Sequence, residues 1–355
     1  MTYGTVLAAG LMGVLTSLCA AQDGSAPSSG WPTLESFTES ADRFSPFTFT
    51  VYWENDGTIL KRNHRTDRHY TNGAAVTFAN QPDWVKGFAD IATFGESFDR
   101  TAAGYIFGQL IFTPENITAK RLLRKDRPYA GYLFGGVYVQ RANDHTFDQA
   151  QLDIGVVGPS SRAEQAQKTV HRALGLDRPN GWDNQLGDEV TAQVFLRRKW
   201  RLDMDPVQWA DAQYAQQVIP QVELAVGSVY RHVSAGATWR VGHNLPDDFG
   251  PGRLADVGSA TGGPSKGPGV YLFGRAAGRV VEHNLFLEGN TFRDSHGVVA
   301  NTLVGELQAG IAVSYPYHGW KLRANYSQTF ITRQFEGQDG PDAFGAIVLS
   351  ASRGF

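Results

Sequence analysis

Residues 47–53 read Phe-Thr-Phe-Thr-Val-Tyr-Trp, and this stretch decides the fold. Its odd-numbered residues are all large and apolar, whereas threonine and tyrosine occupy the positions between them. An alternation with a period of two predicts a β-strand that has two different faces. Similar runs recur along the chain, and we expect about twelve strands. They lie near residues 47–56, 72–79, 104–113, 129–141, 146–158, 188–202, 217–230, 231–244, 268–282, 303–315, 319–335 and 344–355.

The strand pattern predicts an all-β protein, and specifically a transmembrane barrel of about twelve antiparallel strands. Several runs reach the roughly 9–11 residues that a tilted strand needs to cross the hydrocarbon layer. The 40 glycines and the 12% aromatic residues favour many strands and tight turns. The last run ends on Phe355, as outer-membrane barrels often do, although Arg353 interrupts its apolar face. A soluble barrel or sandwich is the alternative.

The N-terminal region predicts export. An apolar segment, Val6 to Ala21, ends in small residues as a secretory signal does, although it lacks a basic beginning. We therefore expect a signal peptide at 1–21, a Ser/Gly/Pro-rich tether at 22–45 and the barrel at 46–355. A single membrane-spanning helix is the rival interpretation of this segment, but the run is short for one. The only cysteine, Cys19, falls inside it, so the mature chain would carry no thiol.

The charge balance restricts the partners. A net charge of −3 with no basic block makes nucleic acid an unsuitable partner. The mean hydropathy of −0.29 suits a soluble protein and a barrel equally, because lipid-facing and lumen-facing residues average out. We expect a monomer in the bacterial outer membrane.

Polar clusters follow alternate strand ends. They include Glu54-Asn55-Asp56, Thr-Asp-Arg-His-Tyr-Thr-Asn-Gly at 66–73, Asp-Arg-Pro-Tyr-Ala-Gly at 126–131, and Gly158-Pro159. If the first strand starts on the periplasmic side, all of them converge on the extracellular rim. Taken alone, Asn55-Asp56 or the Thr-Asn-Gly at 71–73 would be an ordinary turn.

A short helix is expected in the extracellular loop at 161–175. Ser160 or Ser161 is the candidate N-cap and Gly175 the stop. We expect its apolar residues to face the barrel wall and Gln167 and His171, four residues apart, to form the other stripe. A histidine on a helix is more often a surface or packing residue, so its setting beside the other clusters is what favours a catalytic role.

In order and spacing, these clusters together with Gly-Trp-Asp-Asn-Gln-Leu at 181–186 resemble the outer-membrane lipid A 3'-O-deacylase family. The motifs run from about residue 47 to 202, and the strand pattern continues to the end of the chain. The resemblance implies a twelve-stranded barrel that removes an acyloxyacyl chain from lipid A, with calcium in its site. It also implies the roles of individual residues. His171 matches the family's catalytic histidine, Asn55 and Asp56 its Asn-Asp pair, Thr71 its hydroxyl position and, loosely, Lys120 its lysine.

The expected reaction is ester hydrolysis. His171 would act as a base on water, since its ordinary pKa lies near neutrality. Asp56 would bind Ca²⁺, Asn55 would donate to the oxyanion or orient the water, and Thr71 would be an orienting group or itself the nucleophile. A basic loop could bind phosphates of lipopolysaccharide, or it could simply be a solvated rim. Its members are Lys120, Arg121, Arg124 and Lys125.

Two other functions remain open from the sequence. One is an outer-membrane phospholipase that acts on glycerophospholipids. The other is a non-enzymatic barrel or pore, which has no need of a histidine beside an Asn-Asp pair.

Overall fold

Alternation along each strand gives the barrel an apolar outside and a polar inside. The computed structural model describes residues 46–56, 68–91, 95–209, 212–262 and 267–354. In β1 (Phe47–Asn55), Thr48, Thr50 and Tyr52 are buried in the lumen, whereas the residues between them are partly exposed on the outer face. Large exposed side chains continue this outer face around the wall. Examples are Phe107, Ile154, Val190, Leu272, Leu307 and Ile311.

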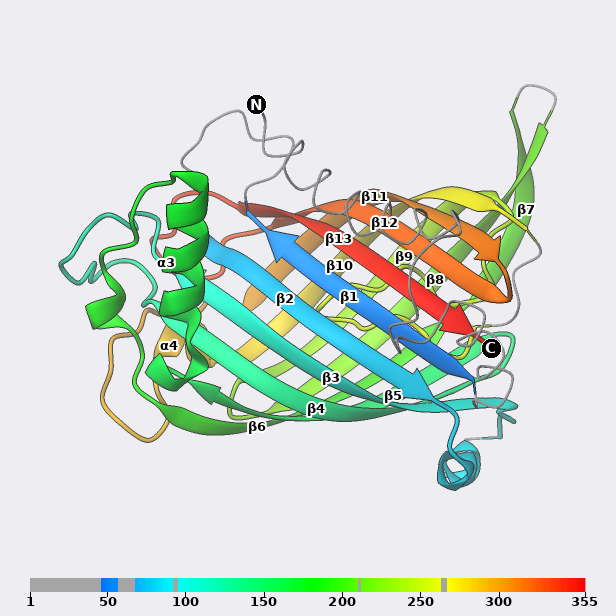
Figure 1. Ribbon diagram of the computed structural model, residues 1–355, viewed down its shortest axis with the longest axis horizontal. Coiled ribbons are helices and arrows are strands. Elements are labelled where there is room, and N and C mark those ends of the chain that lie inside the picture. The colour runs from blue at the N-terminus through cyan, green and yellow to red at the C-terminus, as the bar shows by residue number, and fades with distance from the viewer. Residues whose placement is uncertain (1–45, 57–67, 92–94, 210–211, 263–266, 355) are drawn as a thin grey trace, which may run out of the picture. The chain divides into compact units, whose positions relative to one another are not determined.

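Twelve strands close the barrel within the described residues (Figure 1). Each pairs antiparallel with its neighbours, β1 pairs with β13, and closure comes from β6 pairing with β8. The other strands are β2 (His69–Asn80), β3 (Arg100–Thr113), β4 (Ala130–Ala142), β5 (Thr146–Val157), β6 (Glu189–Trp200), β8 (Ala212–Gly227), β9 (Tyr230–His243), β10 (Gly269–Asn284), β11 (Leu303–Tyr317), β12 (Trp320–Ile331) and β13 (Asp342–Arg353). The predicted antiparallel barrel is confirmed, and each predicted run overlaps one of these strands.

One strand was not predicted. β7 (Leu202–Trp209) pairs only with the first half of β8, and the two form a ribbon that projects beyond the barrel (Figure 1). All eight of its residues are exposed. Pro206 lies where its register with β8 shifts, between Met204 and Val207, and a proline inside a run argues against a strand when only the sequence is known.

Helices are short and few in the described part of the chain. They are η2 (Asp83–Asp90), η3 (Pro159–Ser161), α3 (Ala163–Leu174), η4 (Trp182–Asn184) and α4 (Leu285–Glu288). None of the described helices is long and apolar enough to cross a membrane. The predicted signal segment, the tether and Phe355 lie outside the described residues.

The segment between β9 and β10 folds into the lumen, and we call residues 245–262 the plug loop. Its backbone amides donate to lumen side chains of different strands: Leu254 to Glu54, Gly258 to Tyr52 and Ala260 to Gln140, at 2.9–3.1 Å. Ion pairs add further anchors on other strands. They are Asp248 with Arg240 and Arg323, Arg253 with Glu306, and Asp256 with Lys199. The loop therefore touches the barrel wall on several sides.

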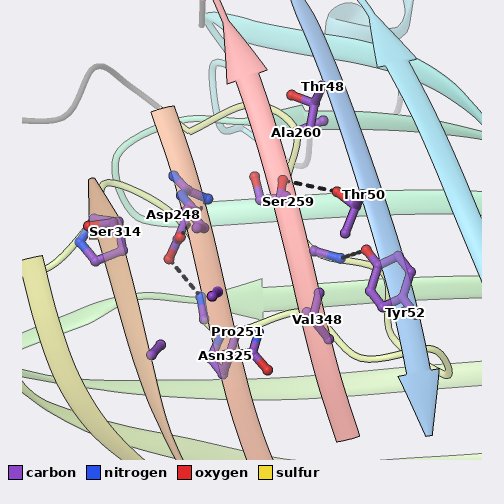
Figure 2. Close-up of a pocket in the computed structure, with 18 of the residues that line it drawn as sticks. Thr48, Thr50, Tyr52, Asp248, Pro251, Ser259, Ala260, Ser314, Asn325 and Val348 are labelled. Atoms are coloured by element: carbon purple, nitrogen blue, oxygen red, sulfur yellow. Dashed lines mark hydrogen bonds and ion pairs between the residues drawn. The ribbon is translucent and has the colours of Figure 1, made fainter. Parts of the chain in front are cut away.

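A small cavity lies between the plug loop and β1, lined by Thr48, Thr50 and Tyr52 (Figure 2). Its volume is about 50 Å³. This volume holds a few water molecules and no lipid. Towards the end that carries α3, buried Leu285, Phe286 and Leu287 of α4 fill the lumen, and the Phe286 ring stacks on that of Phe112 with centroids 4.2 Å apart.

Candidate functional site

The predicted polar clusters lie at one end of the barrel, the end that carries α3 (Figure 1). Strand register shows this directly. Asn55 pairs with Asn72 across β1 and β2, and His69 pairs with Thr113 across β2 and β3. At the same end Val157, the last residue of β5, pairs with Glu189, the first of β6, and α3 lies between these two strands in the sequence. The expectation that the clusters converge on one rim is met for the described residues. Thr66 and Asp67 of the second motif lie outside them.

Asn55, Asp56 and Thr71 form one hydrogen-bonded group. The Asn55 amide nitrogen donates to the carbonyl oxygen of Thr71 at 3.0 Å, and the Asp56 backbone amide donates to the same oxygen at 3.3 Å. The buried Asp56 carboxylate accepts the Arg68 backbone N–H through Oδ2 at 2.6 Å. These contacts fix the direction of both side chains before any substrate arrives.

A β-bulge explains how Thr71 comes to hold this group. The pairing of β2 with β3 passes from Tyr70 opposite Phe112 to Asn72 opposite Ile111, so Thr71 is the extra residue. Bulges at barrel rims redirect side chains and occur often beside active sites. The Thr71 hydroxyl is buried and lies 2.7 Å from the hydroxyl of Thr113.

His171 lies in the last turn of α3 and is buried. Its Nδ1 is 2.5 Å from the carbonyl oxygen of Asp177. Because a carbonyl oxygen can only accept, Nδ1 is the donor of this hydrogen bond and carries a proton. Gly175, at φ 68°, ends the helix, and its N–H caps the His171 carbonyl. The predicted stop at Gly175 is confirmed.

Two expectations for α3 are wrong. The residue before the helix is Arg162, in a left-handed conformation at φ 60°, so neither Ser160 nor Ser161 is the N-cap. The predicted faces of the helix are wrong in part. Ala163 is buried as expected, but Gln167 and His171 also face the protein, whereas Val170 and Leu174 are 52% and 42% exposed. Hydrogen bonds of Gln167 with Trp182 and of His171 with Asp177 hold the helix in this orientation.

The polar face of α3 is packed against the barrel by specific contacts. Gly131 of β4 permits the approach, since a Cβ there would lie 2.1 Å from the Ser161 hydroxyl and 2.2 Å from the Ala163 Cβ. On the other side, the indole N–H of buried Trp182 donates to the Gln167 side chain at 2.8 Å. The Trp182 ring packs on Tyr129, with centroids 4.9 Å apart. In the sequence, Trp182 stands out only as part of the motif at 181–186, with no predicted role.

The predicted basic loop is tied to this same assembly. Asn184 donates to the Lys120 carbonyl at 2.9 Å, and the Tyr129 hydroxyl donates to the Ile117 carbonyl at 2.9 Å. Within the part of the chain that the structure describes, the four basic side chains are exposed and form no ion pair with an acidic residue. They are Lys120, Arg121, Arg124 and Lys125.

The residues at this end suit a hard cation only in a limited way. Asp56 offers a carboxylate and Asn55 an amide oxygen, which are ligand types that calcium accepts together with carbonyls and water. However, no group of three or more His, Cys, Asp or Glu side chains gathers for a metal anywhere in the described residues. A calcium ion held here would therefore draw most of its ligands from backbone and solvent.

Comparison with known proteins settles the family. The model of the family described as outer membrane protein LpxR matches residues 8–353. The chain belongs to the LpxR family. It is thus an outer membrane protein, as the alternation of its strands and its apolar outer wall require. No curated protein matches the LpxR-family chain at a significant level.

A solved structure supports the fold. LpxR from Salmonella typhimurium superposes with a TM-score of 0.69 at 17% identity, covering 85% of this chain and 99% of that one. The β domain of the Bordetella autotransporter BrkA reaches a TM-score of 0.44 at 9% identity, covering 88% of this chain and 100% of that one.

Proposed function

We propose that this LpxR-family barrel is a lipid A 3'-O-deacylase that hydrolyses the 3'-linked acyloxyacyl ester at the extracellular side of the outer membrane. The observation that carries the proposal is the presence of two oriented polar groups at the same end of the barrel. One is the Asn55–Asp56 pair, which bonds the Thr71 carbonyl. The other is His171 in the last turn of α3, whose ring is oriented by the Asp177 carbonyl.

His171 is the proposed general base. Its Nδ1–H bond to Asp177 holds the ring in one orientation and leaves Nε2 as the atom that takes a proton. Nε2 would take it from a water molecule as that water attacks the acyl carbonyl carbon, and would return it to the leaving sugar oxygen. The Asp177 carbonyl stabilises the charged ring that forms between these two steps.

Asn55 and Asp56 are proposed to act on the ester carbonyl. Asn55 would orient the water or donate to the oxyanion, and Asp56 would hold a calcium ion with help from carbonyls and water. When bound, calcium supplies Lewis-acid polarisation of the ester. Thr71 is proposed as the orienting residue, because its carbonyl oxygen accepts from both neighbours.

The nucleophile is proposed to be water. The Thr71 hydroxyl is buried against Thr113, which disfavours it as a nucleophile. The chain has one Gly-x-Ser-x-Gly run, at residues 263–267. It leads into β10 and not into a helix, whereas a nucleophile elbow requires a strand-to-helix turn.

Two surfaces suit a membrane glycolipid. The exposed apolar face of α3, with Val170 and Leu174, is suited to acyl chains at the edge of the bilayer. Lys120 and Arg121 in the exposed basic loop would bind phosphate groups of lipopolysaccharide. The plug loop and α4 occupy the lumen, so the substrate would reach the site from the membrane, and a monomer is sufficient for this.

Hydrolysis by the purified barrel tests the proposal. Wild type, His171→Ala and Asp56→Ala would be incubated with lipid A and, separately, with a glycerophospholipid, with calcium or with a chelator, and products followed by mass spectrometry. We expect the wild type to remove the 3' acyloxyacyl group from lipid A when calcium is present and not when the chelator is present. Neither variant should remove it under either condition. Each barrel should remain folded, seen as a heat-dependent shift on a gel.

The alternative functions give other results. Release of fatty acid from the glycerophospholipid alone would make this protein a phospholipase. Ion conductance in a planar bilayer with no change in either lipid would support a pore. Full activity of either variant on lipid A would overturn the assigned roles.

A further inference from the structure

A second histidine at the same end lies in an unusual setting. His69, the first residue of β2, is buried and left-handed at φ 62°. Its Nδ1 is 2.7 Å from Oδ1 of Asp342, and its Nε2 is 3.3 Å from Oδ1 of Asp126. We call His69, Asp126 and Asp342 the His69 clamp. Left-handed backbone costs a non-glycine residue about 1–2 kcal/mol and persists only where its surroundings enforce it.

Both carboxylates of the clamp are themselves fixed. Asp126 accepts the backbone N–H groups of Glu115 and Arg127 at 2.8 and 2.7 Å. Asp342 accepts the side-chain amides of Gln338 and Gln334 at 2.9 and 3.2 Å. The clamp therefore joins the end of β1–β2, the loop after β3 and the start of β13 through one imidazole ring.

The ring of His69 carries both protons in this geometry. A carboxylate faces each ring nitrogen, and two carboxylates can be satisfied only by two N–H donors. The other charged groups nearby are the side chains of Arg68, 3.6 Å from Asp342, and Glu115, 3.3 Å from Arg68. Burial alone would raise the pKa of Asp126, but its hydrogen bonds from His69 and the backbone lower it. Burial lowers the pKa of neighbouring Arg127 to about 10.

The clamp is connected to the proposed site by one residue. Arg68 precedes His69, and its backbone N–H is the donor that binds the Asp56 carboxylate at 2.6 Å. Fixing His69 in its left-handed conformation fixes the chain direction at Arg68, and so the direction of this N–H. If the backbone at Arg68 were not fixed, forming the hydrogen bond to Asp56 would cost conformational entropy of the chain.

We infer that His69 is a positioning residue, which acts through the Arg68 amide to hold the Asp56 carboxylate in place for calcium and for the ester. This inference rests on the proposed function. It assigns no chemical step to His69, because the carboxylates enclose both of its ring nitrogens.

Three variants, two of them isosteric, test the inference, with one matched control. Asp342→Asn and Asp126→Asn each weaken one side of the clamp, and His69→Asn removes the ring while keeping a residue that tolerates left-handed backbone. The control, Asp248→Asn, removes an equally buried carboxylate from an ion pair in the plug loop. Folding is checked by heat-dependent mobility, hydrolysis by mass spectrometry and calcium affinity by isothermal titration calorimetry.

We expect each clamp variant to fold, to bind calcium about 10- to 100-fold more weakly and to lose a similar factor in hydrolysis, as is usual when a ligand's supporting residue is removed. Excess calcium should restore part of the rate. Asp248→Asn should match the wild type in both measurements. A purely structural role would affect all four variants in proportion to their stability.

Two results would overturn the inference, and they differ from failure of the proposed function. If wild type is active and the clamp variants keep wild-type calcium affinity and rate, His69 does not position Asp56. If wild type does not hydrolyse lipid A but binds calcium, the calcium affinities of the clamp variants still show whether His69 positions Asp56. A wild type that neither hydrolyses lipid A nor binds calcium would overturn both proposals.

Discussion

The lumen with its plug loop and the α3 end of this barrel contain similar polar and charged residues, but these residues make different kinds of contact. In the lumen and the plug loop, charges neutralise one another. Glu306 meets three arginines, Asp256 meets Lys199, and Asp248 meets Arg240 and Arg323. At the α3 end, the polar groups of Asn55, Asp56 and His171 are oriented instead by backbone carbonyls and amides.

The difference separates stability from chemistry. A buried charge that is fully paired resists removal, but it offers nothing to a substrate. Backbone contacts hold a side chain in one direction without neutralising a charge, and the bulge at Thr71 and the left-handed His69 are local strains of the kind that collect at functional sites. Four variants test whether function is confined to the α3 end.

His171→Ala should have the largest effect. Removing a general base lowers a rate by about 10²–10⁴-fold, so acyl release should fall by at least about 100-fold with the barrel still folded. The rate of lipid A hydrolysis in detergent measures this. His232→Ala is the matched control, since His232 is a buried histidine that pairs with Glu223 in the lumen. A loss of rate in the control as large as in His171→Ala would break the comparison.

Leu174→Asp should come next. A charge on the exposed apolar face of α3 would weaken contact with acyl chains, and a loss of about 1.4 kcal/mol corresponds to about a tenfold rise in KM with kcat kept. Met204→Asp on β7, similarly exposed but at the opposite end, is the control. Equal kinetic constants for Leu174→Asp and wild type would show that α3 does not contact the lipid.

The basic loop should contribute less. Replacing both Lys120 and Arg121 with Ala should raise KM a few-fold, because exposed charge pairs contribute about 0.2–1 kcal/mol each. The effect should shrink as salt is added, since ions screen exposed charges. Lys86→Ala, in exposed η2 between β2 and β3, serves as the control. No dependence on salt would favour the solvated-rim interpretation of the loop.

Asp248→Asn should leave hydrolysis unchanged and lower stability. Burial alone would raise the pKa of Asp248, but Arg240 and Arg323 lower it. Its contribution is therefore present at neutral pH and is lost as the pH falls through the lowered pKa. Breaking a buried pair costs about 3 kcal/mol, and urea unfolding of the barrel in detergent measures it. Reduced hydrolysis in this variant would mean that the plug loop takes part in function.

The strands could be predicted from the sequence because their alternation is a local property. Residues 47–53 carry it in full, and the direction of each strand then followed from the order of strands, which placed the polar clusters at one end. β7 could not be predicted, since Pro206 interrupts its pattern. The plug loop has no periodicity at all, and its position depends on side chains of strands far away in the sequence.

The site was predicted only in part, and the failures have physical reasons. That the polar clusters share one end followed from the order of the strands, whereas the roles of their residues remain what the family resemblance implies. The orientation of α3 was wrong in part, because helical periodicity does not encode the hydrogen bonds that turn Gln167 and His171 towards the protein and leave Val170 and Leu174 exposed. The bulge at Thr71, the partner of His171 and the His69 clamp depend on three-dimensional contacts that no local pattern encodes.

The most direct test of the central claim is the mass of lipid A extracted from a host that lacks its own deacylase and expresses this chain. Our account predicts that wild type removes the mass of the 3' acyloxyacyl group, and that His171→Ala, present in the outer membrane in equal amount, leaves lipid A intact. Unchanged lipid A with the wild type, or the same loss of mass with both proteins, would contradict it.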